Sequence, residues 1–277
     1  MHILNLNKES LEPFSLNENT ISTEGELYTF NFESSKKLVK LLDFYGTPYY
    51  NNKLKIILSL NNFRNVLPEE LCIPEGLIQT NDFINGFYLP FIKGTNLKTI
   101  LSSNEVSHNT KIEYLKLVGN LLETIKNIDF YLNDLHEDNF IITDGGKLKA
   151  VDLDSAVIGN TLPFASKYLT PFSLAAHVSK YKVVNEKDAF GYIYPSNDTD
   201  LYCYMIMILN YLLGVRVSSY KIESFNKLLN ELNDIGLDKE LIDVFSLMIS
   251  DKENINLVNL LDTITEKQFN KIRRLRK

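Results

Sequence analysis

The sequence predicts an α+β fold of two lobes, with strands in its first third and mainly helices in the remainder. Before Gly94, short runs rich in aromatic and branched side chains indicate strands, among them LYTFNF at 27–32 and KKLVKLL at 36–42. Beyond Gly94, apolar residues recur at helical spacing instead. We therefore expect a small, β-rich N-terminal lobe, residues 1–93, and a larger, mainly helical C-terminal lobe, residues 94–277.

The strands of the first lobe are separated by polar turns and one short helix. The turn at Glu33–Ser35 joins the first two runs, which predicts a hairpin. Apolar spacing over 52–60 predicts a short helix. The runs IPEGLI at 73–78 and GFYLPFI at 86–92 predict two more strands, with a turn around Asn81–Asp82.

Helical periodicity dominates the second lobe. A helix is predicted from Thr110 to Ile125, with Asn109 or Thr110 as its N-cap. The most apolar segment, Leu201–Leu213, is shorter than the roughly 20 residues that span a bilayer, so it predicts a helix buried in protein and no transmembrane segment. The helices expected after the middle of the chain lie at 199–213, 221–233, 238–250 and 256–270.

Composition narrows the class of protein. The net charge of −6 gives no overall basic field, which argues against nucleic-acid binding by the whole body. Two cysteines are too few for a disulfide framework, and no signal peptide is visible, so we expect a cytoplasmic protein. The basic tail from Lys267, KQFNKIRRLRK, is either a solvated helix or a contact for an acidic partner, nucleic acid or a membrane surface.

The candidate chemistry lies between Asn133 and Asp154. Two short strands, FIIT and LKAVDL, are joined by the turn Asp144–Gly146, which is a strong hairpin signal. A polar loop that contains Asp134 and Asn139 precedes this hairpin. The returning strand ends at Asp152, so the hairpin brings Asp152 back beside the loop.

Two carboxylates and a carboxamide thus converge, from Asp134, Asn139 and Asp152. Hard oxygen ligands of this kind suit Mg²⁺, which binds one or two carboxylates together with substrate phosphates. Taken singly, Asp134 and Asp138 could be turn formers and Asp152 a solvated strand end. The joint spacing favours the metal-dependent interpretation.

The same stretch resembles the protein-kinase superfamily. Asp134-Leu-His-Glu-Asp-Asn139 resembles the catalytic loop, and Val151-Asp152-Leu153-Asp154 resembles the segment that carries the metal-binding aspartate. The resemblance implies ATP and Mg²⁺ as cofactors. It implies that Asp134 accepts the proton of the attacking hydroxyl, and that Asn139 and Asp152 hold Mg²⁺ across the phosphates.

Other features of that family follow in order along nearly the whole chain. Lys40 resembles the strand lysine that pairs with the nucleotide phosphates, and Gly25 resembles the end of the glycine-rich loop that covers them. Asp200, which opens the apolar helix, resembles the residue that hydrogen-bonds the catalytic-loop backbone. The segment before Gly94 resembles the hinge that binds adenine, which implies that nucleotide-contacting positions include Leu89, Pro90 and Ile92.

The sequence departs from the family around the phosphates. Of the expected loop glycines only Gly25 remains, and Thr20 and Ser22 occupy the positions of the others. No acid occurs between Phe44 and Pro68, where a helix glutamate normally anchors the strand lysine, so Lys40 is expected to be less firmly placed.

Three more departures lie in and after the catalytic loop. Asn133 replaces an arginine, which predicts no phosphorylation switch of the usual type, and Asp154 replaces a glycine and adds a potential metal ligand. His136 replaces a lysine, in a pattern shared with aminoglycoside- and choline-type phosphotransferases, although a structural role is equally open.

Three functions remain in competition. The leading one is an ATP- and Mg²⁺-dependent kinase acting on Ser or Thr of a protein substrate, favoured by the apolar central helix and by the segment around Pro171. The second is a small-molecule phosphotransferase, suggested by Asp134-Leu-His136. The third is a catalytically weak, nucleotide-binding scaffold, suggested by the sparse glycine loop and the missing glutamate.

Overall fold

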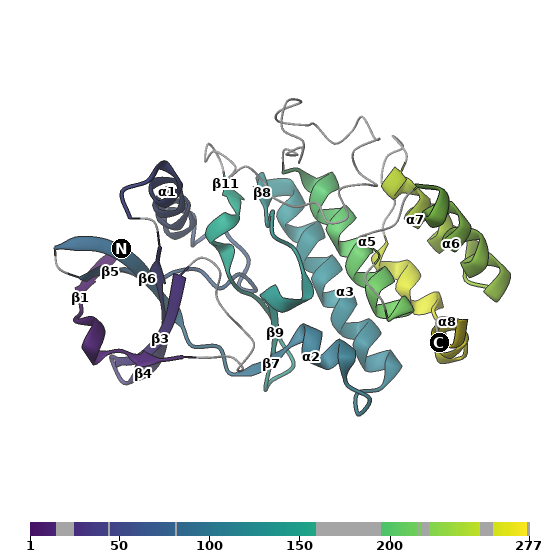
Figure 1. Cartoon of the computed structure of the whole chain (residues 1–277), viewed down its shortest axis with the longest axis horizontal. Helices are drawn as coiled ribbons and strands as arrows, with labels where there is room; N and C mark the ends of the chain where they lie inside the picture. The colour runs from purple at the N-terminus through teal and green to yellow at the C-terminus, as the bar shows by residue number, and fades with distance from the viewer. Residues whose placement is uncertain are drawn as a thin grey trace.

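A computed structural model describes most of the chain. The described residues are 1–14, 25–43, 45–80, 82–158, 195–214, 217, 222–249 and 257–275. Within them, a β-sheet with one helix forms the N-terminal region, and the C-terminal part is mainly helical (Figure 1). The predicted α+β fold, with a small β-sheet region followed by a helical part, is confirmed at this level.

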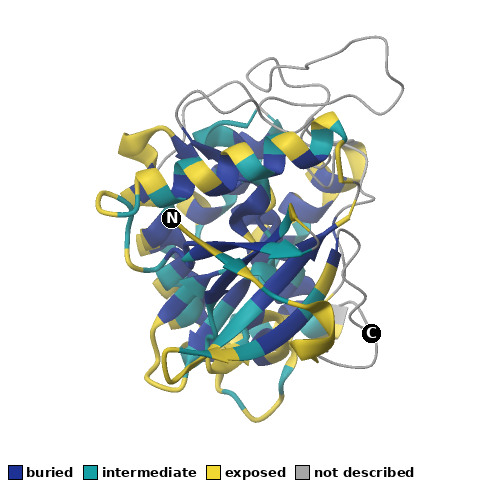
Figure 2. Cartoon of the chain, turned by 90° about the vertical axis from the view of Figure 1, so that its left-hand side faces the viewer, coloured by how far each residue is buried: buried dark blue, intermediate teal, exposed yellow. Residues whose placement is uncertain are grey.

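The N-terminal sheet has six strands in the order β1-β5-β6-β4-β3-β2. β1 runs parallel to β5, and every other neighbouring pair is antiparallel. Figure 2 looks toward this sheet and shows buried residues along its middle strands and exposed ones at its loops. The strands are β1 His2–Asn5, β2 Glu12–Pro13, β3 Gly25–Phe32, β4 Ser35–Leu42, β5 Gly76–Thr80 and β6 Phe83–Pro90.

Both predicted hairpins form in this sheet. Glu33 and Ser34 turn the chain between β3 and β4 with φ angles of 47° and 61°. Positive φ at both central residues matches the twist of the flanking strands, as in a type I′ turn. Asp82, in the turn between β5 and β6, also has a positive φ of 66°.

The helix α1 spans Pro48–Asn62, which is longer than the predicted 52–60. It begins earlier because the Thr47 side chain accepts a hydrogen bond from the Tyr50 N–H, and Pro48 occupies the first turn, where its missing N–H costs nothing. Its buried side chains recur at helical spacing: Tyr50, Lys53, Ile56, Ile57 and Leu60. One member of this apolar stripe is therefore a lysine.

The two faces of the sheet pack against different neighbours. On one face, Val39 and Leu41 of β4 belong to a cluster with Tyr28 and Tyr88. On the other face, Leu42 packs with α1 through Tyr50 and Ile57, with Leu38 at the edge of the same cluster. Since side chains alternate along a strand, Lys40 lies between Leu38 and Leu42 on the face toward α1.

The chain after α1 crosses to the C-terminal part before it returns to the sheet. Leu71 forms a parallel bridge with Ala150. The Ala150 N–H donates to the Glu70 carbonyl and the Cys72 N–H donates to the Ala150 carbonyl, each at 2.8 Å. This short segment therefore joins the end of α1 to the strand that leads to Asp152.

Helices form most of the C-terminal part, with short strands on its side toward the sheet (Figure 1). β7 and β10 flank β9 in a three-stranded sheet, and β8 pairs with β11. The elements are β7 Gly94–Asn96, α2 Leu97–Ser102, α3 His108–Ile125, β8 Phe130–Tyr131, β9 Phe140–Thr143, β10 Leu148–Ala150, β11 Val157–Ile158, α5 Asn197–Leu213, α6 Ile222–Ile235, α7 Lys239–Ser246 and α8 Glu266–Leu275.

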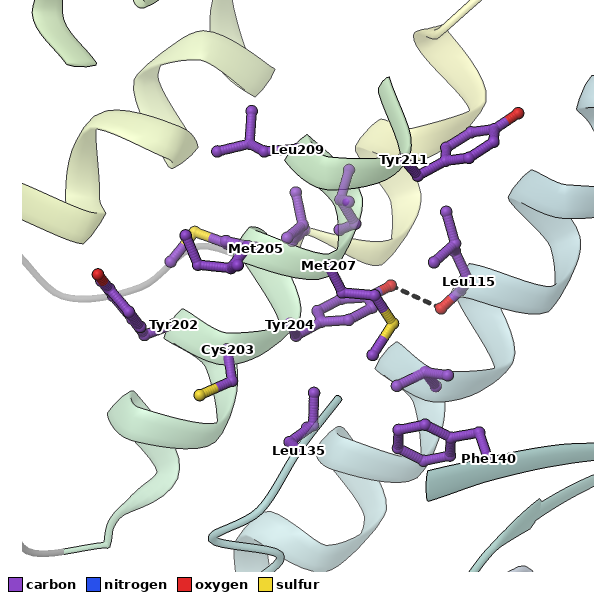
Figure 3. Close-up of a cluster of buried hydrophobic side chains, with 14 of the residues drawn as sticks. Leu115, Leu135, Phe140, Tyr202, Cys203, Tyr204, Met205, Met207, Leu209 and Tyr211 are labelled. Atoms are coloured by element: carbon purple, nitrogen blue, oxygen red, sulfur yellow. Dashed lines mark hydrogen bonds between the residues drawn. The ribbon is translucent and has the colours of Figure 1, made fainter. Parts of the chain in front are cut away.

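The apolar helix α5 is buried, as predicted, beside α3 (Figure 3). Its N-terminus is a capping box in which Ser196 and Thr199 satisfy each other's backbone N–H groups, and Gly214 ends it with a left-handed φ of 69°. The Tyr204 hydroxyl donates to the Leu115 carbonyl of α3 at 2.7 Å. None of the described helices combines the length and the apolar character needed to cross a membrane.

In the helical part, the start of α3 and the last predicted helix differ from the prediction. α3 begins at His108 because Ser107, and not Asn109 or Thr110, accepts the capping hydrogen bond from the Thr110 N–H. The helix expected at 256–270 is divided into a 3₁₀ helix, Val258–Thr263, and α8.

The division of that last helix has a local cause. Thr265 and Gln268 form a reciprocal pair, since the Thr265 N–H donates to Oε1 of Gln268 and the Gln268 N–H donates to the Thr265 hydroxyl. This pair starts a new helix at Glu266.

The basic tail is not a freely solvated helix. Ile272 of α8 is buried in the main core, and Arg273 donates to the Tyr211 carbonyl of α5 at 2.6 Å. Arg273 thereby satisfies one of the last carbonyls of α5, which the helix itself leaves without a partner. The other basic side chains of the described tail, Lys267, Lys271 and Arg274, are exposed.

Candidate active site

Asp134 lies in a tight polar loop between β8 and β9. The loop turns at Asn133, which has a left-handed φ of 62°, so that the Asp134 N–H donates to the Leu132 carbonyl at 2.7 Å. The Asn139 side-chain amide donates to the Asp134 carbonyl at 2.9 Å and to its carboxylate at 3.3 Å. The predicted pair Asp134 and Asn139 is therefore brought into direct contact.

His136 lies against the Asp134 carboxylate. Its Nε2 is 3.6 Å from Oδ2 of Asp134, and its Nδ1 accepts a hydrogen bond from the Asp138 N–H at 3.3 Å. Burial would raise the pKa of Asp134, but His136 and the Asn139 amide outweigh it and lower this pKa. Burial would lower the pKa of His136, and the Asp134 carboxylate raises it above its ordinary value. Asp134 is thus held as a carboxylate.

Asp200 of α5 holds the backbone of the loop that contains Asp134 by hydrogen bonds, as predicted. Its carboxylate accepts hydrogen bonds from the Leu132 N–H at 2.7 Å and the Asn133 N–H at 3.1 Å. The side chain is buried at the N-terminus of α5, where the helix dipole favours a negative charge. Burial raises the pKa of Asp200 to about 7, although the two N–H groups favour the charged form.

The hairpin β9–β10 returns Asp152 to the loop, as the sequence predicts. Ala150 pairs with Phe140, and the Val151 N–H donates to the Asn139 carbonyl at 2.8 Å. Asp152 follows in a left-handed conformation with φ 57° and ψ 49°. A non-glycine residue in this conformation is strained, and such strain gathers at functional sites because the surroundings must enforce it.

Lys40 reaches this hairpin from the N-terminal sheet. Its Nζ lies 2.6 Å from Oδ1 of Asp152 and 2.8 Å from Oδ2 of Asp154, and 6% of its side chain is exposed. Burial alone would lower the pKa of Lys40, but the charges of Asp154 and Asp152 raise it above its ordinary value. Lys40 is therefore a charged, fixed cation at the junction of the sheet and the helical part.

Sequence reasoning missed the second lysine of the site. Lys53 of α1 lies 2.8 Å from Oδ1 of Asp154, and only 1% of its side chain is exposed. Burial would raise the pKa of Asp154, but Lys40 and Lys53 outweigh it and lower this pKa. The signal was present, because Lys53 interrupts the apolar stripe of Tyr50, Ile57 and Leu60 at helical spacing.

This geometry corrects the expectation that Lys40 is loosely placed. Asp154 supplies the second acid that α1 lacks, and it does so from the hairpin side of the junction. Both of its carboxylate oxygens face lysines and 2% of its side chain is exposed, so Asp154 is not a free metal ligand.

The predicted nucleotide-contacting residues Leu89, Pro90 and Ile92 lie at the end of β6 and just after it, beside the strand that carries Lys40. Leu89 of β6 is buried in the cluster between the sheet and α1, and Ile92 and Val151 pack against that same cluster. Leu89 pairs with Leu38 and Pro90 with Lys37 across the β4–β6 ladder. An apolar wall thus lies beside the Lys40–Asp152 pair.

Gly25 is the first residue of β3, opposite Leu42 of β4. A side chain there would place its Cβ 2.0 Å from the Leu41 carbonyl oxygen, so only glycine fits. Two further predicted features, the loop positions Thr20 and Ser22 and the segment around Pro171, lie outside the described residues.

The oxygen donors at the junction fit Mg²⁺. The Asp152 side chain is 41% exposed and lies beside Asn139, whose amide nitrogen is turned toward Asp134. No group of three or more His, Cys, Asp or Glu gathers as a metal site among the residues that the structure describes. A donor set of one carboxylate and one carboxamide instead suits an ion that takes its remaining ligands from phosphates and water.

The comparisons with known proteins give no family. No protein-family model matches the sequence, and no curated protein matches it significantly. The function is therefore inferred from the chain's own residues and their geometry.

Proposed function

We propose that the protein is an ATP- and Mg²⁺-dependent phosphotransferase that transfers the γ-phosphate of ATP to Ser or Thr of a protein. The observation that carries the proposal is the meeting of Lys40 from the sheet with Asp152, beside the Asp134–Asn139 loop. A cation, a metal-binding pair and a candidate base from distant parts of the sequence adjoin one another. Phosphoryl transfer requires this combination, because its catalysis is mainly positioning and charge stabilisation.

The order of elements adds support. In the chain, the hairpin β3–β4 that carries Lys40 is followed by α1, by β5 and β6, by the loop with Asp134 and by the hairpin with Asp152. The contact of Asp200 with the backbone of the Asp134 loop is the one that the resemblance to the protein-kinase superfamily implies. The two-lobed, kinase-like interpretation of the α+β fold belongs to this proposal.

Each residue then has a task in the transfer. The apolar wall of Leu89, Ile92 and Val151 would face the adenine, and Lys40 would neutralise phosphate charge. Asn139 and Asp152 would hold Mg²⁺, which supplies charge stabilisation at the phosphates when bound. Asp134 would accept the proton of the attacking hydroxyl as its oxygen bonds to the γ-phosphorus and the bond to ADP breaks.

One contact favours a second candidate. His136 beside Asp134 suits a small-molecule phosphotransferase, because an imidazole at the base could orient a small alcohol as well as a peptide hydroxyl. Phosphate transfer to an amino alcohol or sugar, with no labelling of protein, would favour this candidate over the protein kinase.

The test is transfer of labelled phosphate from ATP to the protein itself or to a generic protein substrate. We expect transfer by the wild type, and a loss of about 10²–10⁴-fold for Asp134→Asn, since that is the usual contribution of a general base. Asp152→Ala should abolish the Mg²⁺-dependent transfer of phosphate. The matched control is Asp144→Asn, because Asp144 is an exposed turn residue of the same hairpin.

The third possibility, a nucleotide-binding scaffold, has its own signature. Thermal unfolding with ATP, with and without Mg²⁺, detects binding independently of turnover. Stabilisation by ATP without transfer to any protein or small alcohol would contradict the proposed activity and support the scaffold.

A further inference from the structure

Two lysines from different elements share one buried carboxylate. Lys53 of α1 binds one oxygen of Asp154 and Lys40 of β4 binds the other, each at 2.8 Å. Asp154 lies in a single 3₁₀ turn, Leu153–Ser155, directly after Asp152. A single side chain therefore connects the sheet, the helix α1 and the hairpin that carries the proposed metal site.

Among the described residues, the charges of this cluster balance. Lys40 and Lys53 contribute two positive charges, and Asp152 and Asp154 contribute two negative ones. Removing one member would leave an uncompensated charge in a place where 1–6% of the lysine and Asp154 side chains is exposed. Such a cluster is stable only if all its members are present, so the positions of its members depend on one another.

The two acids differ in exposure, and the difference indicates different tasks. The Asp152 side chain is 41% exposed, whereas only 2% of the Asp154 side chain is exposed. Under the proposed function, Asp152 must turn toward Mg²⁺ when ATP binds, and Lys40 must turn toward the phosphates. Asp154, held by Lys53, then remains as the carboxylate that keeps Lys40 in position.

We propose that Lys53 is a positioning residue of the phosphate-transfer site, which acts by holding Asp154 so that Asp154 holds Lys40. This inference rests on the proposed function as far as the nucleotide is concerned. It assigns the anchoring of Lys40 to a Lys–Asp–Lys bridge between α1 and the hairpin, in place of a direct contact between Lys40 and an acid on α1.

The first part of the test measures Lys40 without any nucleotide. The probe is an amine-acylating reagent, and mass spectrometry gives the labelling rate of Lys40 relative to that of the exposed Lys239 of α7, which is present in every variant. We expect Lys53→Met and Asp154→Ala each to speed the labelling of Lys40 several-fold. The control Lys55→Glu changes the charge of the same helix at an exposed position and should leave the Lys40 rate unchanged.

The second part of the test exchanges the two partners. The double variant Lys53→Glu, Asp154→Ala places the carboxylate on α1 in place of the hairpin. Position 53 is near enough to Lys40 for a direct contact, because Lys40 and Lys53 already contact the same carboxylate of Asp154. Asp154 has no left-handed backbone conformation, so alanine fits there. We expect the double variant to protect Lys40 from labelling better than either Lys53→Met or Asp154→Ala does.

The third part uses ATP turnover. A displaced phosphate-binding cation costs about 10²-fold in rate, so Lys53→Met should lower kcat/KM for ATP by about that factor, and the double variant should recover part of it. Far-UV circular dichroism and cooperative unfolding show whether each variant is folded.

The outcomes separate the two proposals. If folded Lys53→Met labels Lys40 no faster than the wild type does, the positioning role is wrong whatever the turnover. If the labelling pattern is as expected while the wild type neither binds nor turns over ATP, the Lys–Asp–Lys bridge stands and the proposed function fails.

Discussion

Asp154 and Asp200 are both buried carboxylates of the candidate site, yet the protein satisfies them by different means. Asp154 faces the two cations Lys40 and Lys53, and its pKa is lowered because these charges outweigh burial. Asp200 accepts hydrogen bonds from two main-chain N–H groups of the loop that contains Asp134, and burial raises its pKa to about 7. Charge pairing joins separate elements, whereas main-chain hydrogen bonds fix the shape of one loop.

The two kinds of interaction lie at different places in the molecule. The Lys40–Asp154–Lys53 cluster lies where the sheet, α1 and the hairpin meet, and long lysine side chains can bridge the distances between elements. Asp200 lies in the first turn of the buried helix α5 and bonds directly to the backbone of the loop that contains Asp134. The short side chain of Asp200 reaches only the two N–H groups next to it, so it fixes one local geometry.

The largest expected effect is the loss of the shared carboxylate. Asp154→Asn leaves Lys40 and Lys53 close together with Asp152 as the one carboxylate of the cluster among the described residues, so the free energy of unfolding should fall by about 3–5 kcal/mol. Urea unfolding at neutral pH measures this. Asp144→Asn, on the exposed turn of the same hairpin, should change it by less than about 0.5 kcal/mol. Equal losses in the two variants would contradict a charge-paired role for Asp154.

The next effect is the pH dependence that Asp200 imposes. Its pKa in the folded state, about 7, exceeds the ordinary value of 3.8, so between these values the folded state keeps a proton that the unfolded state has lost. The stabilisation from this site is complete below about pH 4 and declines as the pH rises toward 7.

Urea unfolding of the wild type and of Asp200→Asn at several pH values isolates this contribution, because the other groups titrate in both proteins. From pH 4.5 to 6.5, the free energy of unfolding of the wild type should fall relative to the variant by roughly 2.5 kcal/mol, with a slope of at most about 1.4 kcal/mol per pH unit. A difference that stays constant over this range would show that Asp200 is ionised throughout.

The hydrogen bond of Tyr204 is neutral and buried, so its contribution to the free energy of unfolding can be compared with those of the charged groups. Tyr204→Phe removes the hydroxyl that donates to the Leu115 carbonyl between α5 and α3 (Figure 3). The free energy of unfolding should fall by about 1 kcal/mol, which is the usual net contribution of one such bond. Differential unfolding in urea suffices to detect it. A loss above that of Asp154→Asn would overturn the ranking of charged over neutral contacts.

The smallest effect should have the opposite sign. The Tyr50 hydroxyl is buried without a hydrogen-bond partner among the described residues. Tyr50→Phe removes a buried polar atom and keeps the ring, so the free energy of unfolding should stay the same or rise by less than about 1 kcal/mol. A clear decrease would mean that this hydroxyl has a partner in the folded protein.

Local patterns predicted much of this site. The turn Asp144–Gly146 fixes the hairpin, and the hairpin fixes Asp152 beside Asn139. The hairpin contacts depend on a short segment whose geometry its own residues determine. The contact of Asp200 with the loop backbone joins residues 68 positions apart, and it was expected from the resemblance to the protein-kinase superfamily.

The Lys–Asp–Lys bridge could not be predicted in the same way. It joins Lys53 and Asp154, which are 101 positions apart in the sequence. A buried lysine on an apolar stripe indicates that an acid must be near, but it does not say which one.

The start of α8 was predictable, since Thr265 and Gln268 have the spacing of a capping box.

The segment that crosses from α1 to β10 has a mechanical consequence. Its hydrogen bonds attach Glu70 and Cys72 to Ala150, two residues before Asp152. The C-terminal end of α1 is therefore fastened to the hairpin, while its N-terminal end follows the sheet through the link from β4. If the sheet rotates against the helical part, α1 must pivot about its fastened end. Lys53, in the N-terminal half of α1, then travels less than Thr47 does, so the bridge to Asp154 is displaced less than the start of the helix is.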